Sequence, residues 1–170
     1  MKFKKPQKHL INYACIMTTG RTGSDYLQGC LDGVPGVITF SGELPFFKFI
    51  ENKKTIEILK KKNLKKIINY LINKNKNLFY YDKLENKKFN FSIKKFKAFF
   101  TIIIKEKKFN KKNFLNSLYL SYHLTINRKI LKKNIIIHHS HNVLETEKFM
   151  RYFKNSKLLV TIRNPFQNLK

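Results

Sequence analysis

Residues 11–25 read INYACIMTTGRTGSD, and this stretch decides the fold. The mostly apolar run Ile11–Met17 has the length of a β-strand, and the threonines and glycine that follow it predict a loop. A helix is predicted over residues 24–31, because Gly33 and Pro35 stop it. A strand that leads through a glycine loop into a helix is typical of the first unit of an α/β domain.

A second unit of the same kind is predicted near the other end of the chain. Apolar residues 135–137 predict a strand, residues 138–141 a polar turn, residues 144–153 a helix and residues 157–162 another strand. Strand, helix and strand in this order predict a parallel sheet with helical crossovers. A chain of 170 residues is long enough to bury one sizeable core, so we expect a single α/β domain over residues 1–170.

The middle of the chain, about residues 51–134, is rich in lysine and asparagine and reads as helical. Leu64, Ile67, Ile68, Leu71 and Ile72 recur at the spacing of one helix face. Residues 48–134 carry 25 basic and 5 acidic residues, a net charge of +20. We interpret these lysines as the solvated faces of amphipathic helices.

The formal net charge of +26 does not by itself predict a specific nucleic-acid partner. Lysine accounts for 32 of the 36 basic residues, and Lys, Asn and Ile together occupy 69 of the 170 positions, which is the bias of A/T-rich codons. Base readout and bidentate phosphate binding favour arginine, of which the chain has 4. Nonspecific binding of polyanions through the middle segment stays open as an alternative function.

Three further features bear on cellular context. No stretch of about 18 apolar residues exists, so no membrane span is predicted. The basic N-terminus is not followed by a convincing cleavage site, so we do not predict a signal peptide. Cys15 and Cys30 show neither metal nor redox spacing, and we expect a reducing, cytoplasmic location.

The loop Thr18–Asp25 is the first candidate site. Its glycines allow a tight turn, backbone amides at a helix N-terminus can bind an anion, and Arg21, Thr22 and Ser24 add donors. Gly23 is followed by Ser24, so the lysine and the magnesium-binding hydroxyl of a nucleoside-triphosphate loop are missing from their places. The pattern therefore predicts an oxyanion site that needs no metal, with a plain turn as the alternative.

Two other residues are candidates on position alone. Glu43 is an isolated acid among apolar neighbours, and such surroundings raise the pKa of a carboxylate toward the range of a general base. Arg163 follows a strand at its carboxyl end, where open parallel sheets bind ligands. The alternatives are a solvated loop carboxylate and an exposed strand-end arginine.

These motifs, in this order, resemble the sulfotransferases that use 3′-phosphoadenosine 5′-phosphosulfate (PAPS), most of all the branch of bacterial carbohydrate and tyrosylprotein sulfotransferases. Gly20–Asp25 is similar to the family's P-R-[ST]-G-[ST]-[ST] loop, with Gly20 in place of the proline and Asp25 in place of the last hydroxyl residue. Residues 31–37 followed by Gly42-Glu43 match L-D-x-x-P-x-V…G-E. Residues 153–158 leading to 163–165 match F-P-x-[AS]-K-[FL]…R-[DN]-P, with Lys154 in place of the proline.

The resemblance implies a P-loop-like three-layer sulfotransferase fold and a metal-free transfer of a sulfuryl group from PAPS to an acceptor hydroxyl. We expect this hydroxyl on a glycan, with a lipid-linked sugar and a tyrosine as alternatives. It implies that the 5′-phosphosulfate is bound by Gly20, Arg21, Thr22, Gly23, Ser24 and Asp25, and the 3′-phosphate by Arg163. Glu43 takes the role of catalytic base. His138 or, one residue on, His139 takes the place of a lysine that neutralises the leaving phosphate, and we assign His138.

The resemblance also sets limits. The family's serine after the 3′-phosphate arginine would fall at position 171, so we expect the C-terminal part of the fold to lie beyond Lys170, and an inactive truncated relative is a second alternative. Histidines at 138, 139 and 141, without a cysteine or an acid near them in sequence, do not predict a metal site.

Overall fold

The computed structural model describes residues 10–18, 22–61, 63–80, 88, 90–105 and 110–162. Among the predicted site residues, Gly20, Arg21 and Arg163 lie outside these ranges. The elements follow one another as β1 (Leu10–Met17), α1 (Ser24–Leu31), β2 (Val37–Ile38), α2 (Phe46–Ile50), α3 (Lys53–Lys60), α4 (Leu64–Lys74), α5 (Lys76–Tyr80), α6 (Ile93–Lys105), α7 (Lys111–Thr125), β3 (Lys133–Ser140), α8 (Val143–Tyr152) and β4 (Lys157–Val160).

The four strands form one parallel sheet in the order β2-β3-β1-β4. β1 and β3 pair along their whole length, from Leu10 opposite Lys133 to Met17 opposite Ser140. β4 joins the other edge of β1 through Ala14–Met17. The chain therefore has the α/β class expected from its strand–helix–strand pattern, and helices make the crossovers between the parallel strands.

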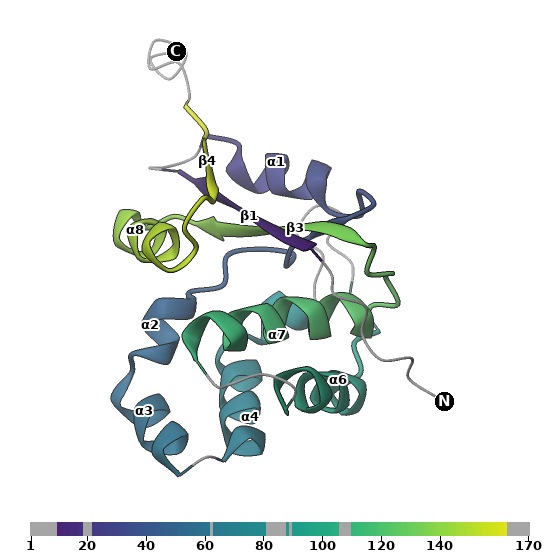
Figure 1. The fold of residues 1–170 in the computed structure, drawn as a ribbon, viewed down its shortest axis with the longest axis vertical. Coiled ribbons are helices and arrows are strands. Elements are labelled where there is room, and N and C mark those ends of the chain that lie inside the picture. Colours follow the sequence, from purple (N-terminus) through teal and green to yellow (C-terminus); the bar gives the residue numbers. More distant parts are fainter. Residues whose placement is uncertain are drawn as a thin grey trace.

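The two faces of the sheet differ in what covers them (Figure 1). Alternate strand residues point to opposite faces. Ala14, Ile16 and Ile137 form a small cluster with Val37, and α1 covers this face with Leu27 and Leu31. The opposite face, which includes Cys15 and Ile136, belongs to a much larger cluster with residues of α2, α4, α6, α7 and α8. The lysine-rich middle thus builds most of the hydrophobic core.

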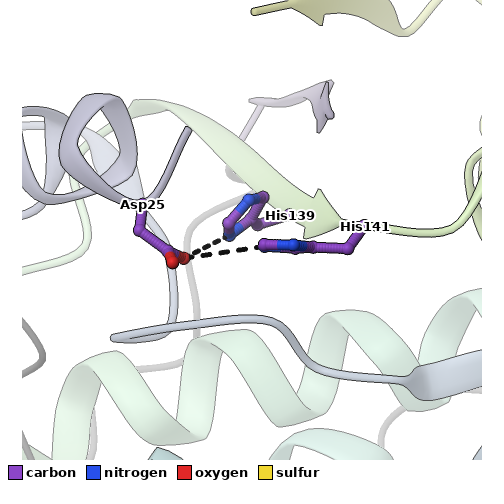
Figure 2. Close-up of side chains that lie close together, drawn as sticks. All are labelled: Asp25, His139 and His141. Atoms are coloured by element: carbon purple, nitrogen blue, oxygen red, sulfur yellow. Dashed lines mark ion pairs between the residues drawn. The ribbon is translucent and has the colours of Figure 1, made fainter. Parts of the chain in front are cut away.

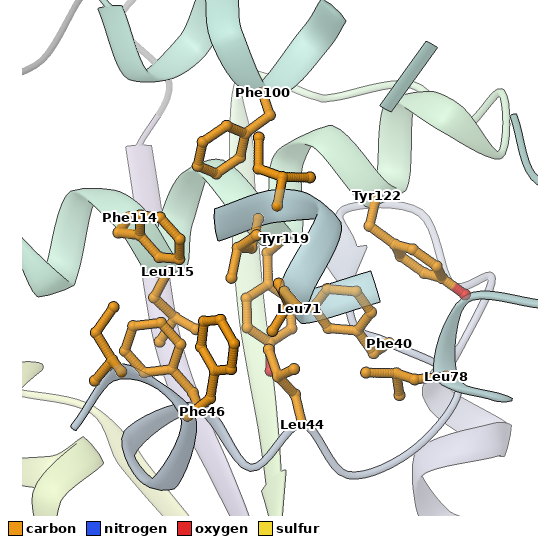
Figure 3. Packing of buried hydrophobic residues seen from close by; sticks show 14 of the residues in the cluster. Phe40, Leu44, Phe46, Leu71, Leu78, Phe100, Phe114, Leu115, Tyr119 and Tyr122 are labelled. Carbon is orange, nitrogen blue, oxygen red and sulfur yellow. The ribbon is translucent and has the colours of Figure 1, made fainter. Parts of the chain in front are cut away.

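Aromatic side chains dominate that larger cluster (Figure 3). Phe40 lies 4.4 Å from Tyr122 and 4.7 Å from Tyr119 between ring centroids, and Phe100 meets Phe114 edge to face at 5.2 Å. Such rings bury large apolar areas, so a few of them stabilise a layer of short helices on the sheet. The lysines of these helices stay in water, as the spacing predicted: in α4, Ile67, Ile68, Leu71 and Ile72 are buried and Lys65, Lys66 and Lys74 are exposed.

Two details of the predicted elements are different in the structure. β3 runs through Ser140, so His138, His139 and Ser140 belong to a strand and not to a polar turn. The reason is that each pairs with a residue of β1 and is buried, and each of the three side chains makes at least one hydrogen bond inside the protein. β2, two residues long, was not predicted. No helix in the part of the chain that the structure describes is long and apolar enough to cross a membrane.

Candidate functional site

The carboxyl edge of the sheet between β1 and β3 is the place where the chain reverses its direction of winding. β1 leads through α1 to β2, on the far side of β3, whereas β3 leads through α8 to β4, on the other side of β1. Open parallel sheets bind ligands outside the carboxyl ends of the strands at such a reversal. The loop after β1 and the residues after β3 both lie at this point.

Gly23 ends the loop in a conformation that favours glycine. Its φ is 82° and its ψ 14°, and its carbonyl accepts a hydrogen bond from the amide of Leu27 at 2.9 Å, the first bond of α1. A side chain at position 23 would meet open space, so the constraint on this residue is the left-handed backbone. Because Gly23 has no side chain to cap α1, the first-turn amides of the helix face the loop, which is the arrangement used for anions.

A line of three hydroxyls joins the loop to the strands on either side of it. The Oγ1 atom of Thr22 lies 2.5 Å from Oγ1 of Thr18 at the end of β1 and 2.6 Å from Oγ1 of Thr161 after β4. Two of the predicted motifs, the loop and the segment that leads to Arg163, therefore meet in space.

Ser24, His139 and Gln28 form a buried chain of hydrogen bonds. The Nε2 atom of Gln28 lies within 3.3 Å of Oγ1 of Thr39 and the carbonyl oxygens of Phe40 and Gly42, all acceptors. The Gln28 amide is therefore oriented with Oε1 toward His139, 2.7 Å from Nδ1, so that Nδ1 carries the proton. Nε2 of His139 then accepts from the Ser24 hydroxyl at 3.1 Å.

Asp25, His139 and His141 converge beside this chain (Figure 2). The Oδ1 atom of Asp25 lies 3.6 Å from Nδ1 of His139 and 3.7 Å from Nε2 of His141. Glu43 is next to them, because its Oε1 accepts a hydrogen bond from the His141 amide at 3.0 Å. Asp25, His139 and His141 each offer one atom able to bind a metal ion, and these three atoms lie within 4.8 Å of one another.

His138 points to the other face of the sheet. It is fully buried, its ring stacks on Phe149 with centroids 4.8 Å apart, and Nδ1 lies 2.9 Å from the Tyr119 hydroxyl. Burial, together with the smaller effect of the neighbouring His139, lowers the pKa of His138 from 6.5 to about 3. The structure thus places the histidine that we assigned to catalysis in the core, while His139 and His141 lie with the loop.

The structure brings together Thr22, Gly23, Ser24, Asp25 and Glu43 from the predicted set and leaves His138 apart. Gln28, which orients His139, was missed in the sequence, because nothing in a helix pattern says that a glutamine will be buried against a strand. The face of the sheet on which His139 lies could have been predicted from the alternation of side chains along β3. Ile137 faces α1, so His139, two residues later, faces α1 as well, provided that the strand continues to that residue.

Fold and site together define an α/β protein with an open parallel sheet and a polar site at its winding reversal. Comparison of the chain with models of protein families, with curated proteins and with solved structures finds no match.

Proposed function

We propose that this protein binds PAPS at the carboxyl edge of β1 and transfers its sulfuryl group to a hydroxyl of a carbohydrate acceptor. One observation carries the proposal: the segments that resemble motifs of PAPS-dependent sulfotransferases are far apart in sequence but meet at one edge of the sheet. Thr22 contacts Thr161, two residues before Arg163, and Glu43 contacts the residue after β3.

The loop is suited to an anion of the 5′-phosphosulfate kind. The α1 amides supply the donors, and hydrogen bonds from Thr22 and Ser24 to neighbouring elements hold the end of the loop in place. Arg21 adds a permanent positive charge within the same loop. Donors fixed in this way stabilise charge that moves onto the departing phosphate during transfer.

Glu43 is the proposed base. In the transfer, an acceptor hydroxyl gives its proton to the Glu43 carboxylate, its oxygen forms a bond to sulfur, and the bond from sulfur to the 5′-phosphate oxygen breaks. The His141 amide holds one carboxylate oxygen, and the side chain is half-buried, so the group has a defined position at the edge of the site. A positioned base of this kind is worth roughly 100-fold or more in rate.

Nucleotide preference tests the proposal. 3′-Phosphoadenosine 5′-phosphate should raise the melting temperature more than ATP with magnesium, because a ligand that binds only the native state stabilises it by mass action. Equal stabilisation by ATP that depends on magnesium would rule out the sulfotransferase assignment. Adenosine 5′-phosphate serves as the matched control, since it lacks the 3′-phosphate that Arg163 is proposed to bind.

A further inference from the structure

Asp25, His139 and His141 present three possible metal-binding atoms close to one another. The separations of 3.6 Å and 3.7 Å both involve Oδ1 of Asp25, and both are too long for hydrogen bonds. Ligands that bind one Zn²⁺ at 2.0–2.1 Å in tetrahedral geometry are about 3.3 Å apart. The two separations that involve Asp25 are therefore a few tenths of an ångström longer than the spacing that a shared metal ion imposes, and all three donor atoms lie within 4.8 Å of one another.

Each ligand is on a part of the chain whose position is well defined. Asp25 lies in the first turn of α1, and His139 in the last part of β3, paired with Ile16 of β1. His141 follows β3 and is tied to Glu43 through its amide. His139 is buried, whereas the side chains of Asp25 and His141 are 47% and 40% exposed, so one end of the group is fixed and the other is open to an ion from solvent.

The hydrogen bonds of His139 are compatible with a metal on Nδ1. An ion there replaces the Nδ1 proton, and the imidazole then carries its proton on Nε2, which donates to the Ser24 hydroxyl at 3.1 Å. A metal-binding histidine usually donates its other ring N–H to an oxygen in this way, which fixes the orientation of the ring. Oε1 of Gln28 lies 2.7 Å from Nδ1, on the side of the ring where the ion would bind, so the Gln28 side chain moves aside when the ion replaces the proton.

We propose that Asp25, His139 and His141 form a binding site for a divalent transition-metal ion, with Zn²⁺ as the best match. A set of two imidazole nitrogens and one carboxylate oxygen favours Zn²⁺ over Mg²⁺ and Ca²⁺, because those two ions are bound by oxygen ligands. Three protein ligands leave a fourth position for water. The site shares Asp25 with the proposed anion loop, but the proposal does not depend on sulfuryl transfer, because it is argued from the positions of these side chains and is tested by metal binding alone.

Cobalt titration of the untagged, chelator-treated chain tests the site, because Co²⁺ in a tetrahedral site of nitrogen and oxygen ligands absorbs visible light. We expect one Co²⁺ per chain, with an absorption that Zn²⁺ abolishes by displacement. Asp25→Asn and His141→Ala each remove one ligand and should weaken Co²⁺ binding by roughly 10- to 100-fold or more. Loss of a residue that only hydrogen-bonds to a metal ligand already weakens metal binding by that factor. Both positions are partly exposed, and circular dichroism verifies that the variants fold.

Glu147→Gln is the control, since it removes an exposed carboxylate on α8 that pairs with Arg151 and should bind Co²⁺ like the wild type. The proposal is overturned if the wild type shows no saturable Co²⁺ spectrum, or if Asp25→Asn and His141→Ala bind as tightly as Glu147→Gln. Either result leaves the nucleotide experiment unaffected, because that experiment uses the chelator-treated chain, to which Mg²⁺ is the only metal ion added.

Discussion

His138 is an imidazole that is kept neutral in the folded protein. Its Nε2 atom has no hydrogen-bond partner, and burial among Tyr119 and Phe149 disfavours the charged form. Because the pKa is 6.5 in the unfolded chain and about 3 in the folded one, protonation favours unfolding. The stability that depends on neutral His138 is complete above pH 6.5 and is lost as the pH falls from there toward 3.

The pH dependence of unfolding checks this. Between pH 7 and pH 5 the wild type should lose about 2 kcal/mol through His138, and His138→Gln, which cannot titrate, should lack that loss. Urea unfolding at the two pH values measures it. Burial raises the pKa of Glu145, so this group titrates with the opposite sign, but it is present in both proteins and cancels in their difference. An equal loss in wild type and variant would show that His138 titrates normally.

Substitution of Glu43 tests whether this residue contributes to turnover and not to nucleotide affinity. Under the proposed function, Glu43→Gln keeps an oxygen for the His141 amide and removes only the base. We expect turnover with PAPS and a carbohydrate acceptor to fall by roughly 100-fold or more, while the affinity for 3′-phosphoadenosine 5′-phosphate stays near that of the wild type. Ser41→Ala, near Glu43 on the same loop, is the control. Normal turnover in Glu43→Gln would make this residue a loop carboxylate and send the search for a base to His139 and His141.

At the scale of elements, α2 depends on a residue nearly a hundred positions away. This five-residue helix begins after Pro45, which provides no side-chain cap. The Glu145 carboxylate of α8 accepts hydrogen bonds from the amides of Phe47 at 2.9 Å and Lys48 at 2.5 Å. A short helix has little stability of its own, so this distant cap and the packing of the phenylalanines hold α2 against α8.

Removing that cap should therefore be costly. Glu145→Ala leaves two amides without their acceptor in a largely buried place, and we expect a loss of about 1.5–3 kcal/mol in the free energy of unfolding. Glu147→Ala, two residues on, removes an exposed ion pair with Arg151 and should change stability by less than about 0.5 kcal/mol. Urea denaturation of the two variants side by side gives both values. If they lose the same free energy, the contacts of Glu145 do not stabilise α2.

At the scale of the whole molecule, the positive charge and the candidate site are carried by different parts. The exposed lysines of α3, α4 and α6 lie on helices that are farther from the sheet than α2 and α7 (Figure 1). The residues of the site come from α1, β3 and the segments that follow β1, β2 and β4. Charges on a solvated face are screened beyond roughly 10 Å at ordinary salt, so these lysines contribute little to a ligand at the site.

Neutralising part of that face distinguishes the proposed function from polyanion binding. With Lys65, Lys66, Lys94 and Lys95 replaced by glutamine, we expect the affinity for 3′-phosphoadenosine 5′-phosphate to change by less than about twofold, while binding to a long anionic polymer weakens and becomes less dependent on salt. Calorimetric titration with each ligand provides the comparison. A fall in nucleotide affinity that follows the number of lysines removed would favour the polyanion binder.

Local patterns in the sequence were sufficient for several of the elements and for the class of fold. The apolar run of β1, the stop signals after α1 and the helical spacing in α4 each act within a few residues, and all three elements are where those patterns predict them. Parallel pairing followed from the same information, because a helix between two strands leaves few other arrangements. The lysine faces also followed, since exposure of a charged side chain is decided by the helix period.

The composition of the site depended on tertiary contacts. Whether β3 stops before His138 or continues through Ser140 depends on its pairing with β1, and this decides that His138 enters the core while His139 meets Gln28 and Ser24. Asp25 lies more than a hundred residues from the histidines in sequence and meets them only because α1 packs across β3. Periodicity acts within one element, but the meeting of two elements depends on strand order, register and the packing of helices on the sheet, which are properties of the whole chain.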